Sequence, residues 1–273
     1  MGRLFVALFC LYLVVVSVEA AKKCRRRISG SRTAKFESQE GPDVAAAASV
    51  RLPNQDVYFW PSLTDKEKKV IRDAFFQIGR RTCLTFKELD YKPWYHADRW
   101  EGKPYVIIRK SKSFTGYSDN DIEDVSRRSI LYLTDKALNN ANFNISRGAV
   151  MDQLVRFMGL KEELHRPDAA SYVQAKKKTG VRRPKFTDAQ LQWPFDPESV
   201  TVPYDARDSY DTTIYCPARS NKNLGAGQRA GLLTRWDAVK LNSMYCPDQI
   251  GYADPRMGPC VVERKGKKNN GSF

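Results

Sequence analysis

The residues best suited to chemistry lie between positions 148 and 173, where acidic, amide and basic side chains follow at helical spacing. Asp152 and Arg156 stand four residues apart, with the acid nearer the N-terminus, which is a favourable order for an ion pair on one helix face. Glu162 follows beyond Gly159, a residue that lets a chain turn sharply. We therefore expect Asp152, Arg156 and Glu162 to form one charged cluster.

A hydrolase with an unorthodox metal site is the alternative, with carboxylate and imidazole ligands drawn from Asp152, Glu162, Glu163 and His165. Two features of the same stretch oppose it. Arg156 brings a permanent positive charge and no lone pair into the cluster, and Gln153 is an amide that cannot act as a general base. The chain contains two histidines, His96 and His165, so a three-histidine metal site cannot form in any fold of it.

The stretch resembles the zinc-binding region of the astacin family of secreted zinc endopeptidases. In that family a helix with H-E-x-x-H-x-x-G-x-x-H runs into a glutamate and an R-P-D-x-x-x-Y-V segment. The matching residues here are Gly148, Leu154, Gly159, Glu163, Arg166, Pro167, Asp168, Tyr172 and Val173. The positions of the three zinc-binding histidines hold Asp152, Arg156 and Glu162, and the position of the water-activating glutamate holds Gln153. The plainer alternative, an unrelated amphipathic helix, accounts for the apolar positions but not for matches elsewhere in the chain.

Two later segments extend the resemblance. Residues 195–204 are similar to the family's methionine turn, Y-D-Y-x-S-I-M-H-Y, at Asp196 and Ser199, but Thr201 stands at the methionine position. Residues 227–246 resemble the family's last helix. The degenerate positions of the resembled site are therefore Asp152, Gln153, Arg156, Glu162 and Thr201, and the resemblance implies a protease framework whose metal site has been lost.

The resemblance also implies a fold class, α+β. It would contain an N-terminal twisted mixed sheet with two long helices and a mostly irregular C-terminal subdomain that ends in a helix. The local pattern agrees, since Thr64-x-x-Glu67 is a capping box and apolar residues then recur at helical spacing to about Gly79. Strands are expected to begin at 82–86 and to occupy 105–108 and 130–133.

The chain divides into four expected parts. These are a signal peptide at 1–20, a basic pro-segment or flexible arm at 21–54, an astacin-like domain at 55–248 and a basic tail at 249–273. The first part has an apolar run followed by small residues before a cleavage point, which is typical of export, and no other run is long enough to span a membrane. We expect a cleft between about 55–160 and 161–248, and a secreted, extracellular protein.

Five cysteines follow the signal segment, an odd number suited to an oxidising compartment. The resemblance implies a disulfide between Cys83 and Cys246. We expect a second between Cys216 and Cys260, which leaves Cys24 in the arm and able to link two chains. Glycosylation sequons begin at Asn144 and Asn270.

The formal net charge is +15, which attracts polyanions. The densest basic run, at 176–185, is either a solvated face or a polyanion site formed by Lys176, Lys177, Lys178, Arg182, Arg183 and Lys185. For an exported protein the expected partners are extracellular proteins, glycosaminoglycans or acidic matrix. Nucleic acid is not expected because no recognition motif is present.

The sequence thus favours a secreted astacin-like pseudoprotease that binds protein or polyanionic matrix without cutting. No cofactor is expected, although the family carries zinc. The alternative is an active zinc metalloendopeptidase with a non-standard metal site.

Overall fold

The computed structural model describes residues 51–112, 128–177, 186, 191–213, 215–216, 221–251 and 253–260. All of them belong to one unit, Pro42–Phe273. The expected signal peptide, the arm up to residue 50 with Cys24, most of the basic run at 176–185, and Asn270 lie outside the described residues. None of the described helices is both long enough and apolar enough to cross a membrane.

The first long helix, α3 (Asp65–Gly79), begins and ends where the sequence predicts. Its capping box is complete, because Thr64 Oγ1 accepts a hydrogen bond from the Glu67 amide at 3.3 Å and Glu67 Oε2 accepts one from the Thr64 amide at 2.8 Å. These bonds satisfy amide groups that the start of a helix leaves without partners. The buried apolar face consists of Val70, Ile71, Ala74, Phe75 and Ile78.

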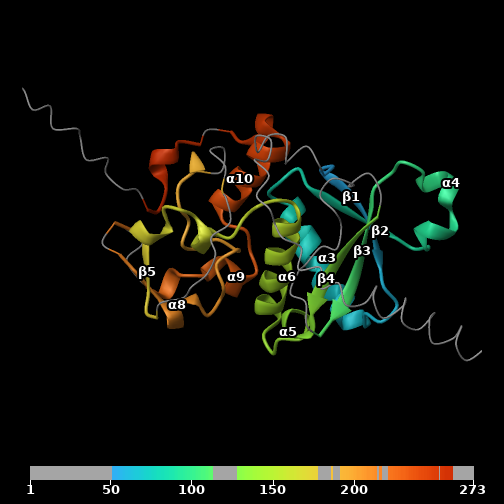
Figure 1. Ribbon diagram of the computed structural model, residues 1–273, viewed down its shortest axis with the longest axis horizontal. Coiled ribbons are helices and arrows are strands. Elements are labelled where there is room, and N and C mark those ends of the chain that lie inside the picture. The colour runs from blue at the N-terminus through green and yellow to red at the C-terminus, as the bar shows by residue number, and fades with distance from the viewer. Residues whose placement is uncertain are drawn as a thin grey trace, which may run out of the picture. The chain divides into compact units, whose positions relative to one another are not determined.

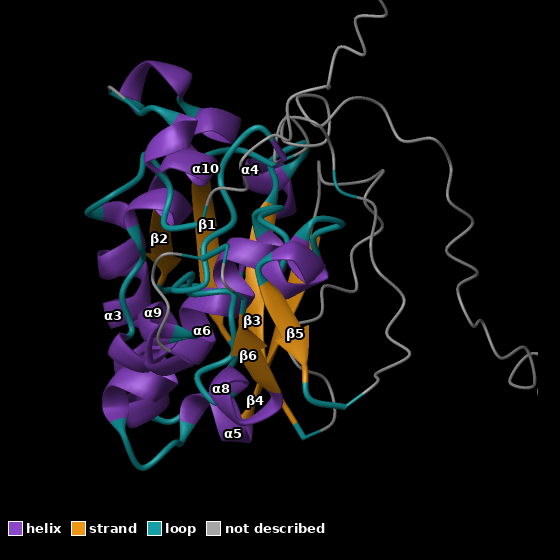
Figure 2. Cartoon of the chain, turned by 90° about the vertical axis from the view of Figure 1, so that its left-hand side faces the viewer, coloured by secondary structure: helices purple, strands orange, loops and turns teal. Residues whose placement is uncertain are grey.

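A four-stranded sheet packs against this helix (Figures 1 and 2). Its strands, in the order β2-β1-β3-β4, are β2 (Thr85–Leu89), β1 (Asn54–Phe59), β3 (Tyr105–Ser111) and β4 (Arg128–Thr134). Every pairing among these strands is parallel. The mixed sheet predicted above is therefore wrong for the described strands, because that expectation came from the resembled family and not from the strand residues themselves.

The second long helix, α6 (Phe143–Phe157), lies beside α3 and closes the main apolar core. Alternate strand residues, such as Val57, Val106 and Leu131, point from the sheet into this core. The helix passes very close to the short helix α9 (Ala226–Ala230). A Cβ atom on Gly148 would lie 1.9 Å from the carbonyl oxygen of Gln228, so the crossing requires glycine.

The remaining described chain is mostly turns and short elements. It includes α4 (Ala97–Trp100), α5 (Asp135–Leu138) and α8 (Ala206–Ser209). It also includes an antiparallel pair, β5 (Val173–Ala175) and β6 (Tyr210–Thr212), and the helix α10 (Arg235–Tyr245). Both expected disulfides are confirmed: Cys83–Cys246 connects the end of α10 to the segment after α3, and Cys216–Cys260 joins two C-terminal segments.

Candidate functional site

The candidate site is built on the C-terminal half of α6, which carries Asp152, Gln153 and Arg156. The helix ends in a Schellman turn at Gly159, whose φ is +95°. The Gly159 amide donates to the carbonyl of Arg156 at 2.9 Å and the Leu160 amide donates to that of Val155 at 3.0 Å. This turn sends the chain back along the helix end and brings Glu162 toward Arg156.

Arg156 lies between two carboxylates. Its Nε is 3.1 Å from Oδ1 of Asp152, and its Nη1 is 3.2 Å from Oε2 of Glu162. The contact with Glu162 is a hydrogen bond, whereas the close contact with Asp152 is an ion pair without hydrogen-bond alignment. The guanidinium group is about one-third exposed, and both carboxylates are more buried than it is. The three residues therefore form one compact charged group.

Gln153 completes this group. Its Nε2 donates to Oδ2 of Asp152 at 2.9 Å, and its Oε1 accepts from Nη2 of Arg156 at 3.3 Å. The amide thus uses both of its ends to hold its two neighbours on α6. We call Asp152, Gln153, Arg156 and Glu162 the charged plug.

Burial of Asp152 raises the pKa of its carboxyl to about 7. The positive charge of Arg156 lowers this pKa in part, while the nearby carboxylates of Glu162 and Asp237 raise it further. Desolvation is the largest of these effects, because burial penalises the charged form of an acid. The plug therefore holds a carboxyl group that changes charge near neutral pH.

The two histidines lie in different places. His165 Nδ1 is 3.5 Å from Oε2 of Glu162, so this imidazole borders the plug. His96 lies in the segment after β2, where its ring meets that of Tyr91 edge to face with centroids 5.0 Å apart. Among the described residues, no three His, Cys, Asp or Glu side chains are arranged to hold a metal ion.

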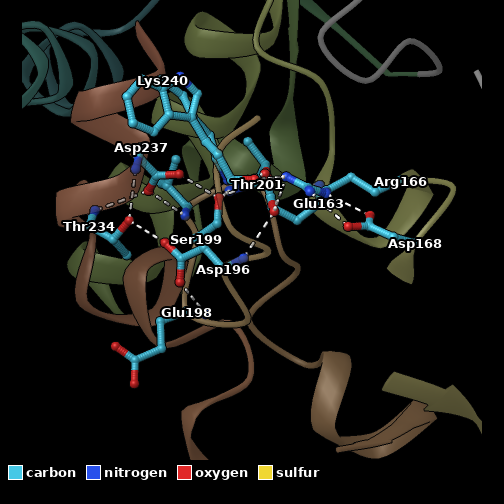
Figure 3. A network of polar contacts seen from close by, with 12 residues as sticks. Glu163, Arg166, Asp168, Asp196, Glu198, Ser199, Thr201, Thr234, Asp237 and Lys240 are labelled. Carbon is cyan, nitrogen blue, oxygen red and sulfur yellow. Dashed lines mark hydrogen bonds and ion pairs between the residues drawn. The ribbon is translucent and has the colours of Figure 1, made fainter. Parts of the chain in front are cut away.

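A buried polar network lies beside the plug and fixes the turn that follows α6 (Figure 3). Oε1 of Glu163 is 2.6 Å from Nζ of Lys240 on α10, and Oε2 of Glu163 accepts from the Asp196 amide at 3.0 Å. Arg166 lies 3.7 Å from the same carboxylate and binds Asp168 through two hydrogen bonds of 2.9 Å. The network anchors the residues immediately after Glu162.

Thr201, at the position of the resembled family's methionine, belongs to this network. Its hydroxyl accepts from the Glu163 amide at 3.2 Å and lies 2.9 Å from the hydroxyl of Ser199. Ser199 in turn donates to Asp237 at 2.5 Å. These hydrogen bonds of Thr201 and Ser199 tie the 195–201 segment to the turn after α6 and to α10.

Asp196 and Asp237 cap α10 together. Thr234 and Asp237 form a capping box, and Thr234 Oγ1 also donates to Oδ2 of Asp196 at 2.5 Å. Burial raises the pKa of Asp196 to about 7, with a further rise from the charge of Asp237.

Sequence reasoning missed the pairing of Lys240 with Glu163, because the two residues are far apart in the chain. The sequence offered one indication of a buried lysine: Lys240 lies one turn after Asp237 and between the apolar residues Val239 and Leu241.

The other predicted site residues are described only in part. Lys176 and Lys177 are exposed, and Lys176 Nζ donates to the Arg207 carbonyl at 3.0 Å. Asn144 is exposed in the first turn of α6, whereas the sequon's Ser146 is buried and accepts from the Asn140 amide. Glycosylation and polyanion binding at these positions stay predictions.

The sheet, its two long helices and the C-terminal helix define the fold of an astacin-like protease. One solved structure with a similar fold is high choriolytic enzyme 1, a hatching enzyme zinc-protease from the medaka fish Oryzias latipes. It aligns with a TM-score of 0.50 and 18% sequence identity, over 71% of this chain and 90% of that chain. No protein-family model matches the sequence, and no curated protein matches it either. At this identity the likeness concerns the fold alone.

Proposed function

We propose that this chain is an exported, catalytically inactive relative of the astacin-like zinc endopeptidases that acts by binding extracellular protein or polyanionic matrix. The observation that carries the proposal is the position of Arg156, whose guanidinium group contacts the carboxylates of both Asp152 and Glu162. These three residues stand where the resembled family has its zinc-binding histidines.

The donor set of the plug does not fit a zinc ion. Zinc in such a site needs neutral imidazole or anionic ligands with free lone pairs. Here both carboxylates contact one guanidinium, which itself has no lone pair and repels a divalent cation. A zinc ion would have to displace Arg156 and leave its charge without a partner in a half-buried place.

The position of the catalytic base supports the same conclusion. Gln153 occupies the place of the family's glutamate, and its amide is bonded at both ends to Asp152 and Arg156. An amide cannot take a proton from water at neutral pH. Neither the metal ligand set nor the general base of the resembled enzymes is therefore present in this stretch.

Export and a binding role rest on separate features. The N-terminal 20 residues have the pattern of a signal peptide. The two disulfides suit an oxidising compartment. The net charge of +15 favours acidic partners.

The test combines metal analysis with a protease assay on the purified secreted protein. We expect less than about one-tenth of a zinc ion per chain and no cleavage of casein or gelatin, with or without a chelator. Stoichiometric zinc together with chelator-sensitive cleavage would overturn the proposal in favour of an active metalloendopeptidase.

A restored variant serves as the matched comparison. It carries Asp152→His, Gln153→Glu, Arg156→His and Glu162→His. We expect it to take up zinc weakly and to show little activity, because Thr201 still replaces the methionine beneath the site. Zinc uptake by this variant but not by the natural protein supports the view that the plug residues exclude the metal.

A further inference from the structure

The face of the sheet opposite to α3 and α6 is aromatic. The strand register places Tyr58 beside Ile107, and Ile107 beside Ile130, in one row on this face. The row forms an apolar cluster with Trp60, Trp94, Tyr105 and Tyr132. No residue of α3, α6 or α10 belongs to this cluster. Tyr58, Ile107 and Ile130 themselves are buried, so the solvent-accessible part of the cluster consists of the partly buried rings around them.

The segment between β2 and β3 adds further rings to this face. Trp94 packs edge to face on Tyr58, with centroids 5.3 Å apart, and lies 5.9 Å from the ring of Trp60. Next to it, Tyr95 is 72% exposed, which is unusually high for a large aromatic residue. The segment thus extends a half-buried aromatic cluster into a solvent-exposed surface.

Three cations are held against these rings. The guanidinium carbon of Arg109 lies 4.1 Å from the centroid of Trp60, and Nζ of Lys92 lies 5.2 Å from that of Tyr95. Arg99 lies 5.7 Å from the ring of Tyr91. Among the described residues, none of the three cations is within ion-pair distance of a carboxylate. By contrast, Arg72 and Arg147 on the helical side are paired with Glu88 and Asp73.

The aromatic rings and the cations held against them together indicate the chemistry of a ligand. A guanidinium held against an indole ring by its charge still has N–H groups to donate, and these suit the two oxygens of a carboxylate or sulfate. Exposed aromatic rings pack well against the C–H groups on the flat side of a pyranose sugar. A sugar chain with regularly spaced negative groups can make both contacts, the hydrogen bonds to the cations and the packing against the rings.

We propose that this aromatic–basic face, comprising Trp60, Lys92, Trp94, Tyr95, Arg99 and Arg109, binds an acidic polysaccharide built of hexuronate and sulfated amino sugars. The rings support the sugar planes, and the three cations bind the carboxylate and sulfate groups. The basic N-terminal arm at 21–54 is a poor occupant for the same surface because it carries the same sign of charge. The inference rests on the binding role proposed above, for which it names a surface and a ligand class. It does not depend on the loss of catalysis.

The experiment compares two matched double variants in binding to a size-defined heparan sulfate octasaccharide at 0.15 M salt. The first, Lys92→Gln with Tyr95→Ala, removes one cation and one exposed ring from the aromatic–basic face. The second, Arg80→Gln with Phe76→Ala, removes the same at the C-terminal end of α3, where Arg80, the residue after the helix, lies 5.6 Å from the ring of the 60% exposed Phe76. Both variants lose one positive charge, so an effect of net charge alone weakens both equally.

We expect the first variant to raise the Kd at least 10-fold and the second to change it less than 2-fold. Arg109→Gln, which removes the cation held against Trp60, should also raise the Kd at least 10-fold. The natural protein should bind the desulfated, carboxyl-reduced octasaccharide at least 10-fold more weakly. Circular dichroism and thermal unfolding of each variant establish that the fold is kept.

Four results would overturn the inference. The first two are that the natural protein does not bind the octasaccharide, and that the two double variants weaken its binding equally. The third is that a single-stranded oligonucleotide binds as tightly as the octasaccharide or more tightly. The fourth is that octasaccharide binding is lost only when Arg182→Ala and Arg183→Ala are introduced in the basic run. Zinc content and protease activity, measured on the same preparation, separate a failure here from a failure of the proposed loss of catalysis.

Discussion

Nζ of Lys240 lies 2.6 Å from Oε1 of Glu163, and both side chains are almost completely buried. The pair joins α10 to the turn that carries Glu162, although the two residues are 77 positions apart. A buried ion pair adds little net stability compared with apolar residues of the same shape, but an unpaired buried charge is costly. The pair therefore makes the position of the turn beside the plug depend on α10.

Replacement of Lys240 by methionine should strongly destabilise the protein. The change leaves the Glu163 carboxylate buried without its closest cation, and we expect a loss of about 3 to 5 kcal/mol in the free energy of unfolding. Denaturant unfolding at pH 7 measures it. Lys68→Met is the control, since Lys68 pairs at 3.8 Å with Asp65, whose side chain is fully exposed, and the change should alter stability by less than about 1 kcal/mol. Equal losses in the two variants would contradict the assigned role of the buried pair.

The plug should make stability depend on pH through Asp152. Burial raises the pKa of this carboxyl to about 7 in the folded protein. Its value in the unfolded chain is about 3.9. The folded state then holds the proton more tightly, so the contribution of this group to stability is full below about pH 4 and is lost as the pH rises through 7.

Asp152→Asn tests this dependence because the amide cannot titrate. The difference in free energy of unfolding, natural protein minus variant, should fall between about pH 4 and pH 7 with a slope approaching 1.4 kcal/mol per pH unit. Taking the difference removes the similar contribution of Asp196, whose pKa is also raised to about 7. A difference that stays constant or increases with pH in this window would count against a raised pKa for Asp152.

The features that depend on neighbours in the chain were the easiest to predict. The capping box at Thr64 and the turn at Gly159 rest on contacts between residues a few positions apart, and both are present. The approach of Asp152, Arg156 and Glu162 also follows from helical spacing and one turn. The direction of the strands does not, because parallel and antiparallel pairing use the same alternation of side chains.

The two disulfides were predicted, but two other features that depend on packing between distant segments were not. The pairing of Lys240 with Glu163 requires α10 to pass behind the turn after α6, which no local pattern specifies. The aromatic–basic face likewise depends on the register between β1, β3 and β4, which aligns Tyr58, Ile107 and Ile130. Sequence alternation shows which residues share a face, but not which elements cover that face.

Removal of the guanidinium from the plug should expose the repulsion between its two acids. In Arg156→Met, Asp152 and Glu162 lose the cation that lies between them, and we expect a loss of about 1 to 3 kcal/mol at pH 8, reduced for the partial exposure of the site. The loss should decrease toward pH 5 as Asp152, whose pKa burial raises to about 7, takes up a proton. Thermal unfolding at both pH values measures it, with Arg99→Met, an exposed cation, as the control. A loss that is the same at pH 5 and pH 8 would mean that Arg156 acts through packing rather than charge.

The crossing of α6 and α9 should tolerate no side chain at Gly148. A Cβ atom there would lie 1.9 Å from the Gln228 carbonyl oxygen, which is backbone and cannot rotate away, so the two helices must move apart. We expect Gly148→Ala to cost about 2 to 3 kcal/mol in denaturant unfolding, as for other overpacked positions. The control is Gly102→Ala, where φ is +68° and nothing lies within 4 Å of the new atom, so only backbone strain of about 1 kcal/mol is added. If Gly148→Ala cost no more than Gly102→Ala, the close helix crossing that positions the plug residues on α6 would be wrong.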